Sequence, residues 1–312
     1  MNQESRPRVA VVGSFMMDLV VQCNHLPLGG QTVVGQDFVT FVGGKGSNQA
    51  IAAARLGADV SMIGRLGADG FGDELLKNLS AEGVNGQFVV RDTEMGTGVA
   101  MITVDKNGNN TIVAVPKANM SLNPDNIDQA ESEIAAADIL LLQLEVNLLA
   151  VQRAAEIAKA NGVPVLLNPA PAHQIPVELM NLVDIIVPNE TETEFLTGCR
   201  LTDMETIKSA ARHLLAESAP TVILTLGDQG ALLATAEDIQ LFPSYSVKAV
   251  DATAAGDAFC GTLAVSIARG DSWGSAVNFA NAAGALTVTK LGAAPSIPMR
   301  EQVIELIERN RN

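Results

Sequence analysis

The sequence predicts a doubly wound α/β fold, with a mostly parallel sheet and helices on both faces. The first observation is that short apolar runs of strand length alternate with amphipathic segments of helix length. The second is that polar residues follow these runs directly, as expected where parallel strands end at one edge of a sheet. The third is bulk: 312 residues with 47% hydrophobic content suffice for one large domain, expected to span residues 1–312.

The expected elements follow in chain order. The first strand, Arg8–Val12, ends at Gly13, and a helix (Ser47–Leu56), a strand (Val60–Ile63) and a second helix (Gly70–Glu82) come after it. The later strands are short β-branched or Leu-rich runs: Ile139–Leu142, Val165–Leu167, Ile185–Val187, Val222–Thr225 and Ala231–Thr235. The helices between and after them are Leu148–Ala160, Glu190–Leu196, Met204–Glu217, Ala258–Ala268, Gly274–Thr289 and Arg300–Arg309. A β-prone run, Tyr245–Val250, is expected as the strand before the Ala258 helix.

Two early β-rich pairs do not fit this rhythm. Asp18–Cys23 and Thr32–Phe41 form one pair, and Val99–Val104 and Asn110–Val115 flank a clear hairpin turn at 105–109. The pattern itself leaves open whether they are edge strands of the main sheet or a sheet of their own.

Composition restricts the class of partner. A formal net charge of −15 argues against a nucleic-acid or anionic-membrane partner. The cysteines, Cys23, Cys199 and Cys260, show neither metal spacing nor a disulfide framework, which is typical of a reducing cytosol. With no apolar signal core before Val9 and no run of membrane-spanning length, we expect a cytoplasmic protein.

The stretch Val250–Gly261 carries the clearest chemistry. Ala254, Ala255 and Gly256 have little side chain to cover the first N–H groups of the following helix, and such an end binds anions. Asp257 lies in the same turn. Its carboxylate either caps the helix or acts as a general base beside an anion hole, and spacing alone does not separate the two.

A glycine-rich turn, Gly43-Gly44-Lys45-Gly46-Ser47-Asn48-Gln49, precedes the first expected helix. It lacks the spacing of a Walker A loop. The alternatives are a tight strand-to-helix turn and a ligand-binding loop.

Polar groups follow several strands. Asp18 lies beyond the first strand, Glu145 follows Leu142, and Asn189 and Glu192 follow Val187. Any one of them can be an ordinary turn or cap residue. Their shared position at strand ends favours a ligand site at the carboxyl edge of the sheet.

Two of these stretches resemble the signatures of one family. Asp251–Phe259 is similar to the C-terminal signature of the ribokinase-like (pfkB) carbohydrate kinases, with Ala-Ala-Gly-Asp where many members read Gly-Ala-Gly-Asp. The segment from Gly43 to Gly67 is similar to their N-terminal signature. The resemblance extends from Val9 to Met299 and implies a small β-sheet lid, built from segments near 17–41 and 97–116.

The resemblance also implies residue roles. Asp257 would be the catalytic base, with Ala254, Ala255 and Gly256 forming the anion hole. The sugar-binding positions would be Ser14, Met16, Asp18, Gly43, Gly44, Lys45, Gly46, Asn48 and Glu145. The nucleotide-binding positions would be Asn189, Thr225, Gly227, Asp228, Gly230, Gly256 and Asn281, with Glu192 near Mg²⁺ through water. A monovalent cation would lie at Asp251, Thr253, Thr287, Lys290, Gly292 and Ser296.

The function that this resemblance implies is ATP-dependent phosphorylation of the 5-hydroxyl of D-ribose, with Mg²⁺ as cofactor, K⁺ as activator and a homodimer formed through the lid. A 2-deoxy-D-ribose kinase is the alternative. A nucleoside kinase would favour aromatic walls around a base, and aromatic residues make up only 4% of the chain. A non-catalytic sugar-binding protein would tolerate loss of the base and anion hole, and both are intact.

Met16 raises a question of specificity. The best-known family members carry Asn at the matching position, whose amide can bind the sugar on the side of the 2-hydroxyl. Methionine offers only a weak acceptor on an apolar, adaptable chain. We therefore expect unusual tolerance of 2-deoxy-D-ribose, unless Met16 only packs against the lid.

Overall fold

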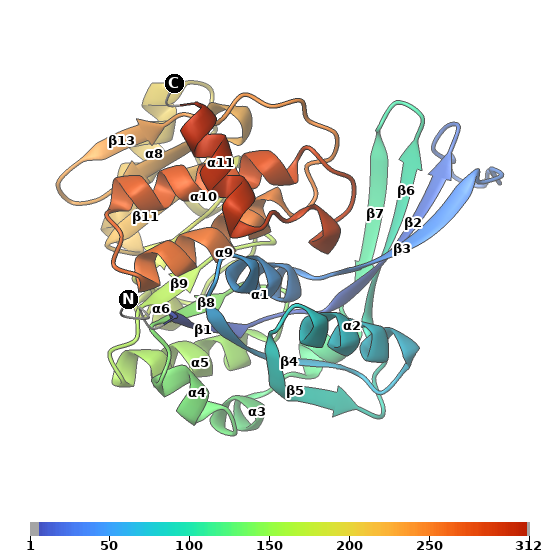
Figure 1. Ribbon diagram of the computed structural model, residues 1–312, viewed down its shortest axis with the longest axis horizontal. Coiled ribbons are helices and arrows are strands. Elements are labelled where there is room, and N and C mark those ends of the chain that lie inside the picture. The colour runs from blue at the N-terminus through green and yellow to red at the C-terminus, as the bar shows by residue number, and fades with distance from the viewer. Residues whose placement is uncertain (1–5, 311–312) are drawn as a thin grey trace.

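The computed structural model describes residues 6–310 (Figure 1). It contains a nine-stranded sheet of order β13-β12-β11-β10-β9-β8-β1-β4-β5 and a four-stranded sheet of order β3-β2-β6-β7. Figure 1 shows the small sheet projecting from one side of the main body. The predicted fold class is confirmed.

All pairings of the main sheet from β5 across to β11 are parallel. The pairings of β11 with β12 and of β12 with β13 are antiparallel. Its strands are β1 (Arg8–Val12), β4 (Asp59–Gly67), β5 (Asn85–Asp92), β8 (Ile139–Leu142), β9 (Val165–Leu167), β10 (Ile185–Ile186), β11 (Thr221–Thr225), β12 (Ala231–Ala234) and β13 (Ile239–Phe242). The central strands are continuous apolar runs because helices cover both of their faces.

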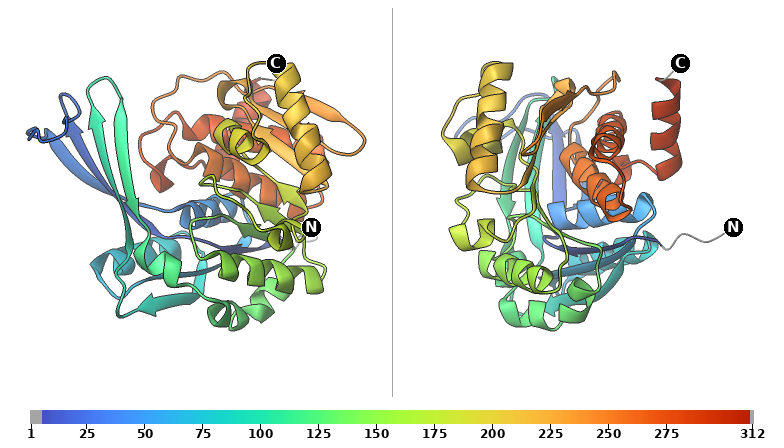
Figure 2. Two further views of the ribbon diagram at one scale, coloured as in Figure 1. Left: turned by 180° about the vertical axis from the view of Figure 1, so that it is seen from behind. Right: turned by 90° about the vertical axis from the view of Figure 1, so that its left-hand side faces the viewer.

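Two helical layers enclose this sheet (Figure 2). One core lies beneath α1 (Lys45–Arg55), α2 (Gly70–Ala81), α9 (Ala255–Ala268), α10 (Trp273–Thr287) and α11 (Arg300–Arg309). The other core lies beneath α3 (Pro124–Asp128), α4 (Glu131–Ala135), α5 (Leu148–Ala160), α6 (Val177–Met180), α7 (Glu190–Thr197) and α8 (Met204–Glu217). Three short 3₁₀ turns connect elements: η1 (Lys117–Ser121), η2 (Gly227–Gln229) and η3 (Ala294–Ser296). Within residues 6–310, no helix combines the length and apolarity that a bilayer crossing requires.

The small sheet consists of β2 (Met16–Cys23), β3 (Asp37–Gly43), β6 (Gly98–Asp105) and β7 (Asn110–Val115). Its two hairpins join through a parallel pairing of β2 with β6. The two early β-pairs therefore form a sheet of their own and are not edge strands of the main sheet.

The prediction of a strand at Tyr245–Val250 is wrong, because that segment has no ladder partner. The Val250 and Asp251 N–H groups both donate to the carbonyl of Val288, at the end of α10. The strand expected from Thr32 begins only at Asp37. Sequence patterns missed β5, β13, α3, α4 and α6, which are edge strands or short helices of four or five residues.

The chain reverses its direction of strand addition at β1. It first adds β4 and β5 on one side, and later adds β8 to β11 on the other. In open α/β sheets, ligands bind outside the carboxyl ends of the strands at such a switch point. The glycine-rich turn, Ser14 and Glu145 all lie at this point.

Candidate active site

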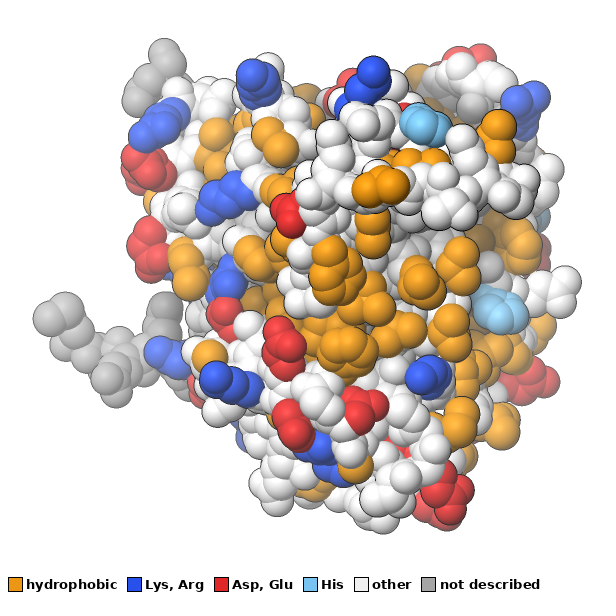
Figure 3. All heavy atoms as spheres, turned by 90° about the vertical axis from the view of Figure 1, so that its right-hand side faces the viewer, with side chains coloured by type: hydrophobic (Ala, Val, Ile, Leu, Met, Phe, Trp, Pro, Cys, Tyr) orange, Lys and Arg blue, Asp and Glu red, His pale blue; other side chains and the backbone are white. Residues whose placement is uncertain are grey.

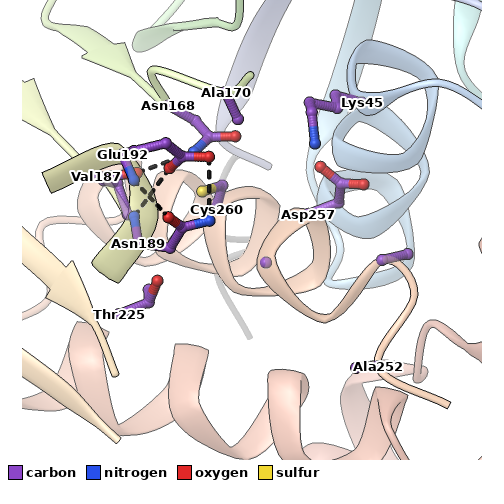
Figure 4. Close-up of a pocket in the computed structure, with 12 residues that line it drawn as sticks. Lys45, Asn168, Ala170, Val187, Asn189, Glu192, Thr225, Ala252, Asp257 and Cys260 are labelled. Carbon is purple, nitrogen blue, oxygen red and sulfur yellow. Dashed lines mark hydrogen bonds between the residues drawn. The ribbon is translucent and has the colours of Figure 1, made fainter. Parts of the chain in front are cut away.

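A cavity of about 190 Å³ opens between the carboxyl ends of the main sheet and the N-termini of α1 and α9 (Figure 4). Its lining is Lys45, Asn168, Ala170, Val187, Asn189, Glu192, Thr225, Ala252, Ala254, Gly256, Asp257 and Cys260. It brings together predicted residues from both family signatures, which lie more than two hundred positions apart in the chain.

The N-terminus of α9 presents unpaired donors to this cavity. Ala254 adopts a left-handed backbone with φ 61°, unusual for a residue with a side chain. The N–H of Ala255 donates to the carbonyl of Ala252 at 3.2 Å. The N–H groups of Gly256 and Asp257 have no acceptor within residues 6–310, and no side chain caps the helix. Free N–H groups at a helix N-terminus are suited to an anion, and the anion hole itself stays a prediction.

Asp257 is 8% exposed and accepts side-chain hydrogen bonds on both oxygens. Asn48 donates to its Oδ2 at 2.9 Å, and Gln49 donates to its Oδ1 at 3.0 Å. Burial raises the pKa of Asp257, while the Lys45 ammonium and the two amides act in the opposite direction. Because Asp257 does not cap α9 with its side chain, the geometry favours the general-base interpretation over the capping one.

Lys45 is the first residue of α1, and its ammonium and the carboxylate of Asp257 point toward one another (Figure 4). Burial lowers the pKa of Lys45, but Asp257, Glu145 and Glu192 raise it by more, so the ammonium stays charged. The preceding Gly44 has φ 94°, and a Cβ there would lie 2.7 Å from the backbone N of Met16. Only glycine fits this turn, which sets the direction of Lys45.

On the sugar side, Glu145 is held between β1 and α1. Its Oε2 accepts from Ser14 Oγ at 2.5 Å and from the backbone N–H of Lys45 at 3.1 Å. Asp18 lies beside Gly43, where a Cβ would come within 2.8 Å of its Oδ2. Burial, together with the charges of Glu145 and Asp257, raises the pKa of Asp18 to about 7. These carboxyl groups thus form one electrostatically coupled group.

Met16 lies where the small sheet joins the main body, and it is 6% exposed. Its sulfur is 3.6 Å from Nδ2 of the buried Asn119. A Cβ on Gly98 would lie only 2.6 Å from that sulfur, so the thioether is closely packed.

At the far end of the cavity, Asn189 and Glu192 form a capping box on α7. Glu192 accepts from the backbone N–H of Asn189 at 2.9 Å and from its amide at 3.0 Å. Burial raises the pKa of Glu192 despite these donors. Carboxylate oxygens keep further lone pairs, so Glu192 can accept from a water on Mg²⁺, which fits the predicted role.

Thr225 ends β11 and forms a bridge with Asn189. The following turn, η2, holds Gly227 at φ 54° and Gly230 at φ 100°, conformations suited to glycine. Asp228 lies in this turn, and its charge adds to burial in raising the pKa of Glu190.

Asn281 stands apart from this group. Its Nδ2 donates to the carbonyls of Phe242 and Pro243, at 3.0 and 3.4 Å, and it does not line the cavity. Its predicted nucleotide contact stays a prediction.

Hydrogen bonds join several of the predicted cation positions to one another. Asp251 Oδ1 accepts from the N–H and hydroxyl of Thr253, and its Oδ2 accepts from the Gly292 N–H at 2.9 Å. Burial would raise the pKa of Asp251, but these hydrogen bonds outweigh it and lower the pKa. The Thr287 and Ser296 hydroxyls donate to carbonyls of their own turns. Lys290 donates its N–H to the Thr287 carbonyl at 3.3 Å.

Sequence reasoning missed three polar residues around Asp257: Gln49, Gln143 and Asn168. All are buried at strand ends or on α1, and they hydrogen-bond to one another. Their one signal was position, since Gln49 lies in the glycine-rich stretch, and Gln143 and Asn168 directly follow predicted strands.

The fold and the site together define a small-molecule kinase of the α/β type, with a buried carboxylate next to a helix end that has free N–H groups, at the sheet's switch point. The chain belongs to the pfkB family of carbohydrate kinases, whose sequence profile matches residues 6–300.

Individual relatives agree with this assignment. The chain is 41% identical to a ribokinase of Staphylococcus aureus (strain COL) over 298 residues, which cover 95% of this chain and 98% of the relative. It is 38% identical to a deoxyribokinase of Salmonella typhi over 303 residues, which cover 97% and 99% respectively. Among solved structures, Arabidopsis thaliana ribokinase complexed with ribose and ATP superimposes with a TM-score of 0.91 at 33% identity, covering 98% of this chain and 99% of that one.

Proposed function

We propose that this protein transfers the γ-phosphoryl group of ATP to the 5-hydroxyl of D-ribose. The observation that carries the proposal is the arrangement at α9, where the Asp257 carboxylate lies beside the free N–H groups of Gly256 and Asp257. A base and an anion hole within one helical turn are what in-line phosphoryl transfer to an alcohol requires.

In the proposed mechanism, Asp257 takes the proton of the attacking hydroxyl while the free N–H groups hold the charge on the transferring phosphoryl. The Lys45 ammonium faces the same point and compensates the growing negative charge. Mg²⁺ held through water near Glu192 and Asn189 would neutralise the phosphates of ATP. Most of the acceleration comes from positioning and electrostatics, each of which contributes several kcal/mol in enzymes of this kind, about 3 kcal/mol per anion-hole donor.

The sugar is expected to lie against Asp18, Glu145 and Asn48. Asn48 Oδ1 is buried and has no hydrogen-bond partner within the described chain, whereas its Nδ2 holds Asp257. An unpaired buried acceptor costs about 1–3 kcal/mol, which a sugar hydroxyl would relieve by donating to it. Asn48 thereby links sugar position to the base.

The small sheet is proposed to act as a lid. Asp18 on β2 belongs to both the sheet and the sugar site, so closure would bring this carboxylate onto the substrate and exclude water. On the face opposite to Asp18, Met101 and Val113 pair directly and are 60% and 63% exposed. Figure 3 shows apolar side chains gathered on this side of the molecule. A second copy of the chain is the proposed cover, giving a homodimer.

Two further assignments belong to the same proposal. A monovalent cation, K⁺, is proposed at the loops joined by Asp251 and Gly292, where it would stiffen the turn before the anion hole. The expected location is the cytoplasm.

The alternative sugar is 2-deoxy-D-ribose. Met16 favours it, since a thioether enclosed by Asn119 and Gly98 offers little to a 2-hydroxyl.

The test is ADP formation from ATP and Mg²⁺ with ribose, 2-deoxyribose, fructose, fructose phosphates and nucleosides, with ³¹P NMR of the product. The expected result is turnover of ribose, with 2-deoxyribose accepted, and a 5-phosphate ester. Preference for a nucleoside or a phosphosugar would contradict the proposal.

A further inference from the structure

Behind Asp257 runs a chain of buried side-chain amides. Gln143 Nε2 donates to Gln49 Oε1 at 2.6 Å. Gln49 Nε2 then donates both to Asp257 Oδ1 at 3.0 Å and to Asn168 Oδ1 at 3.1 Å. Asn168 in turn donates to the carbonyl of Val187 at 2.9 Å. Gln143 and Gln49 are 0% exposed and neither lines the cavity.

The direction of this chain is fixed at each link. Reversing the amide of Gln49 would set its oxygen against the oxygens of Asp257 and Asn168. Reversing Gln143 would set its oxygen against that of Gln49. Asn168 is fixed because its Nδ2 supplies the Val187 carbonyl. Gln49 therefore presents only donors to the carboxylate of Asp257.

Gln143 has little freedom to move. Its Oε1 has no partner among the described residues, and a Cβ on Gly13 would lie 2.0 Å from that oxygen. The side chain is thus wedged between the end of β1 and α1. Leaving the buried Oε1 of Gln143 without a hydrogen bond costs free energy. In return, this orientation points Nε2 of Gln143 at Oε1 of Gln49.

We infer that Gln49 is a positioning residue for the catalytic base and that Gln143 holds Gln49 in its donating orientation. A donor on Oδ1 stabilises the ionised form of Asp257 against burial and fixes the rotation of its carboxylate. The other oxygen, Oδ2, faces Asn48 and the proposed sugar side. This inference rests on the proposed function of Asp257 as base.

The groups that face Asp257 set its pH response. They are the Lys45 ammonium, the carboxyl groups of Glu145, Asp18 and Glu192, the Cys260 thiol, and the two amides from α1. Burial and the neighbouring carboxylates raise the pKa of Asp257, and the Gln49 donor opposes that rise. Removing this donor therefore weakens the opposition. The pKa of the base then rises, and the acidic limb of the rate profile moves to higher pH.

The experiment compares the pH profiles of kcat for ribose phosphorylation in wild type, Gln49→Met, Gln143→Met and the double variant. Methionine keeps the length of the side chain and removes the amide. Gln49→Met is expected to lower kcat about ten- to a hundredfold at neutral pH, to shift the acidic limb upward, and to leave the Kd for ribose unchanged. Gln143→Met should produce a smaller shift of the same sign.

Because Gln143 acts through Gln49, the double variant should have the same acidic limb in its pH profile of kcat as Gln49→Met alone. Ser266→Ala is the matched control: its hydroxyl is buried in the same helix as Asp257 and has no hydrogen-bond partner among residues 6–310, so its pH profile should match that of wild type. Should Gln49→Met not fold, Gln143→Met carries the test alone.

An unmoved acidic limb in these variants, with activity lowered equally at every pH, would overturn the positioning role and leave the proposed function intact. Wild type without sugar-dependent ADP formation would instead overturn the proposed function and this inference with it.

Discussion

Ser14 Oγ donates to Glu145 Oε2 at 2.5 Å, although the two residues are 131 positions apart. The bond joins the carboxyl end of β1 to that of β8, across the point where the sheet reverses direction. The same carboxylate oxygen accepts the N–H of Lys45, so it also fixes the start of α1. The switch point is therefore held rigidly around the place where the sugar is proposed to bind.

Sugar binding should depend on pH through Asp18. Burial and the nearby Glu145 and Asp257 raise its pKa to about 7, and only the ionised form accepts from two sugar hydroxyls. The KM for ribose is expected to rise as the pH falls below about 7. A KM that is constant between pH 8 and 5.5 would contradict this role.

Asp18 also has a stability consequence. The pKa of Asp18 in the folded protein lies above the ordinary aspartate value of 3.8, so ionisation disfavours the folded protein. Relative to acid solution, stability is lost as the pH rises from about 4 through 7. Asp18→Asn should thus raise Tm at pH 8 and lose that advantage at pH 4, as measured by thermal unfolding without ligands. An advantage of equal size at both pH values would point to packing instead of charge.

We propose that Met16 affects specificity at the 2-position of the sugar. Met16→Asn should shift the ratio of kcat/KM values toward ribose and away from 2-deoxyribose. A hydroxyl without a partner costs about 1–3 kcal/mol, so a shift of tenfold or more is expected. The close contacts of the sulfur with Asn119 and Gly98 supply the competing explanation, pure packing. If packing is the explanation, Met16→Asn loses stability while the ratio of the two kcat/KM values does not change.

Potassium should raise activity above that in choline buffer of equal ionic strength. Asp251→Asn keeps the side-chain size but removes the charge that Thr253 and Gly292 surround, and it should abolish the K⁺ response. The measurement is the initial rate against K⁺ concentration. Equal rates with K⁺ and choline in wild type would remove the cation from the account.

The exposed apolar face of the small sheet predicts an oligomer. Val113→Lys should convert a dimer to a monomer in light scattering, since a charge buried at an interface without a partner is costly. Val177→Lys, at a position 69% exposed on α6, is the matched control and should leave the mass unchanged. A wild-type protein that is monomeric at high concentration would refute the dimer.

Features of the structure could be predicted from the sequence where residues close together in the chain determine them. The uncapped N-terminus of α9 and the turn before Lys45 were predictable because small residues and glycines determine them within a few positions. Tyr245–Val250 misled because β-propensity does not supply a pairing partner, and Asn281 already occupies the carbonyls before it.

The amide chain of Gln143, Gln49 and Asn168 was not predictable either. Gln49 lies on α1, whereas Gln143 and Asn168 directly follow β8 and β9. Their roles follow from contacts between residues that lie 94 and 119 positions apart in the sequence. Nothing in the pattern of buried Gln and Asn side chains indicates which carboxylate they support.

The most direct test of the account is Asp257→Asn, assayed for ADP formation with ribose and for ribose binding by calorimetry. The variant should fold and bind ribose, because asparagine keeps the shape of the side chain between Asn48 and Gln49. Turnover should fall by about 10²–10⁴-fold, the usual contribution of a positioned base. Turnover close to wild type would contradict the assignment of Asp257 as the base that takes the sugar's proton.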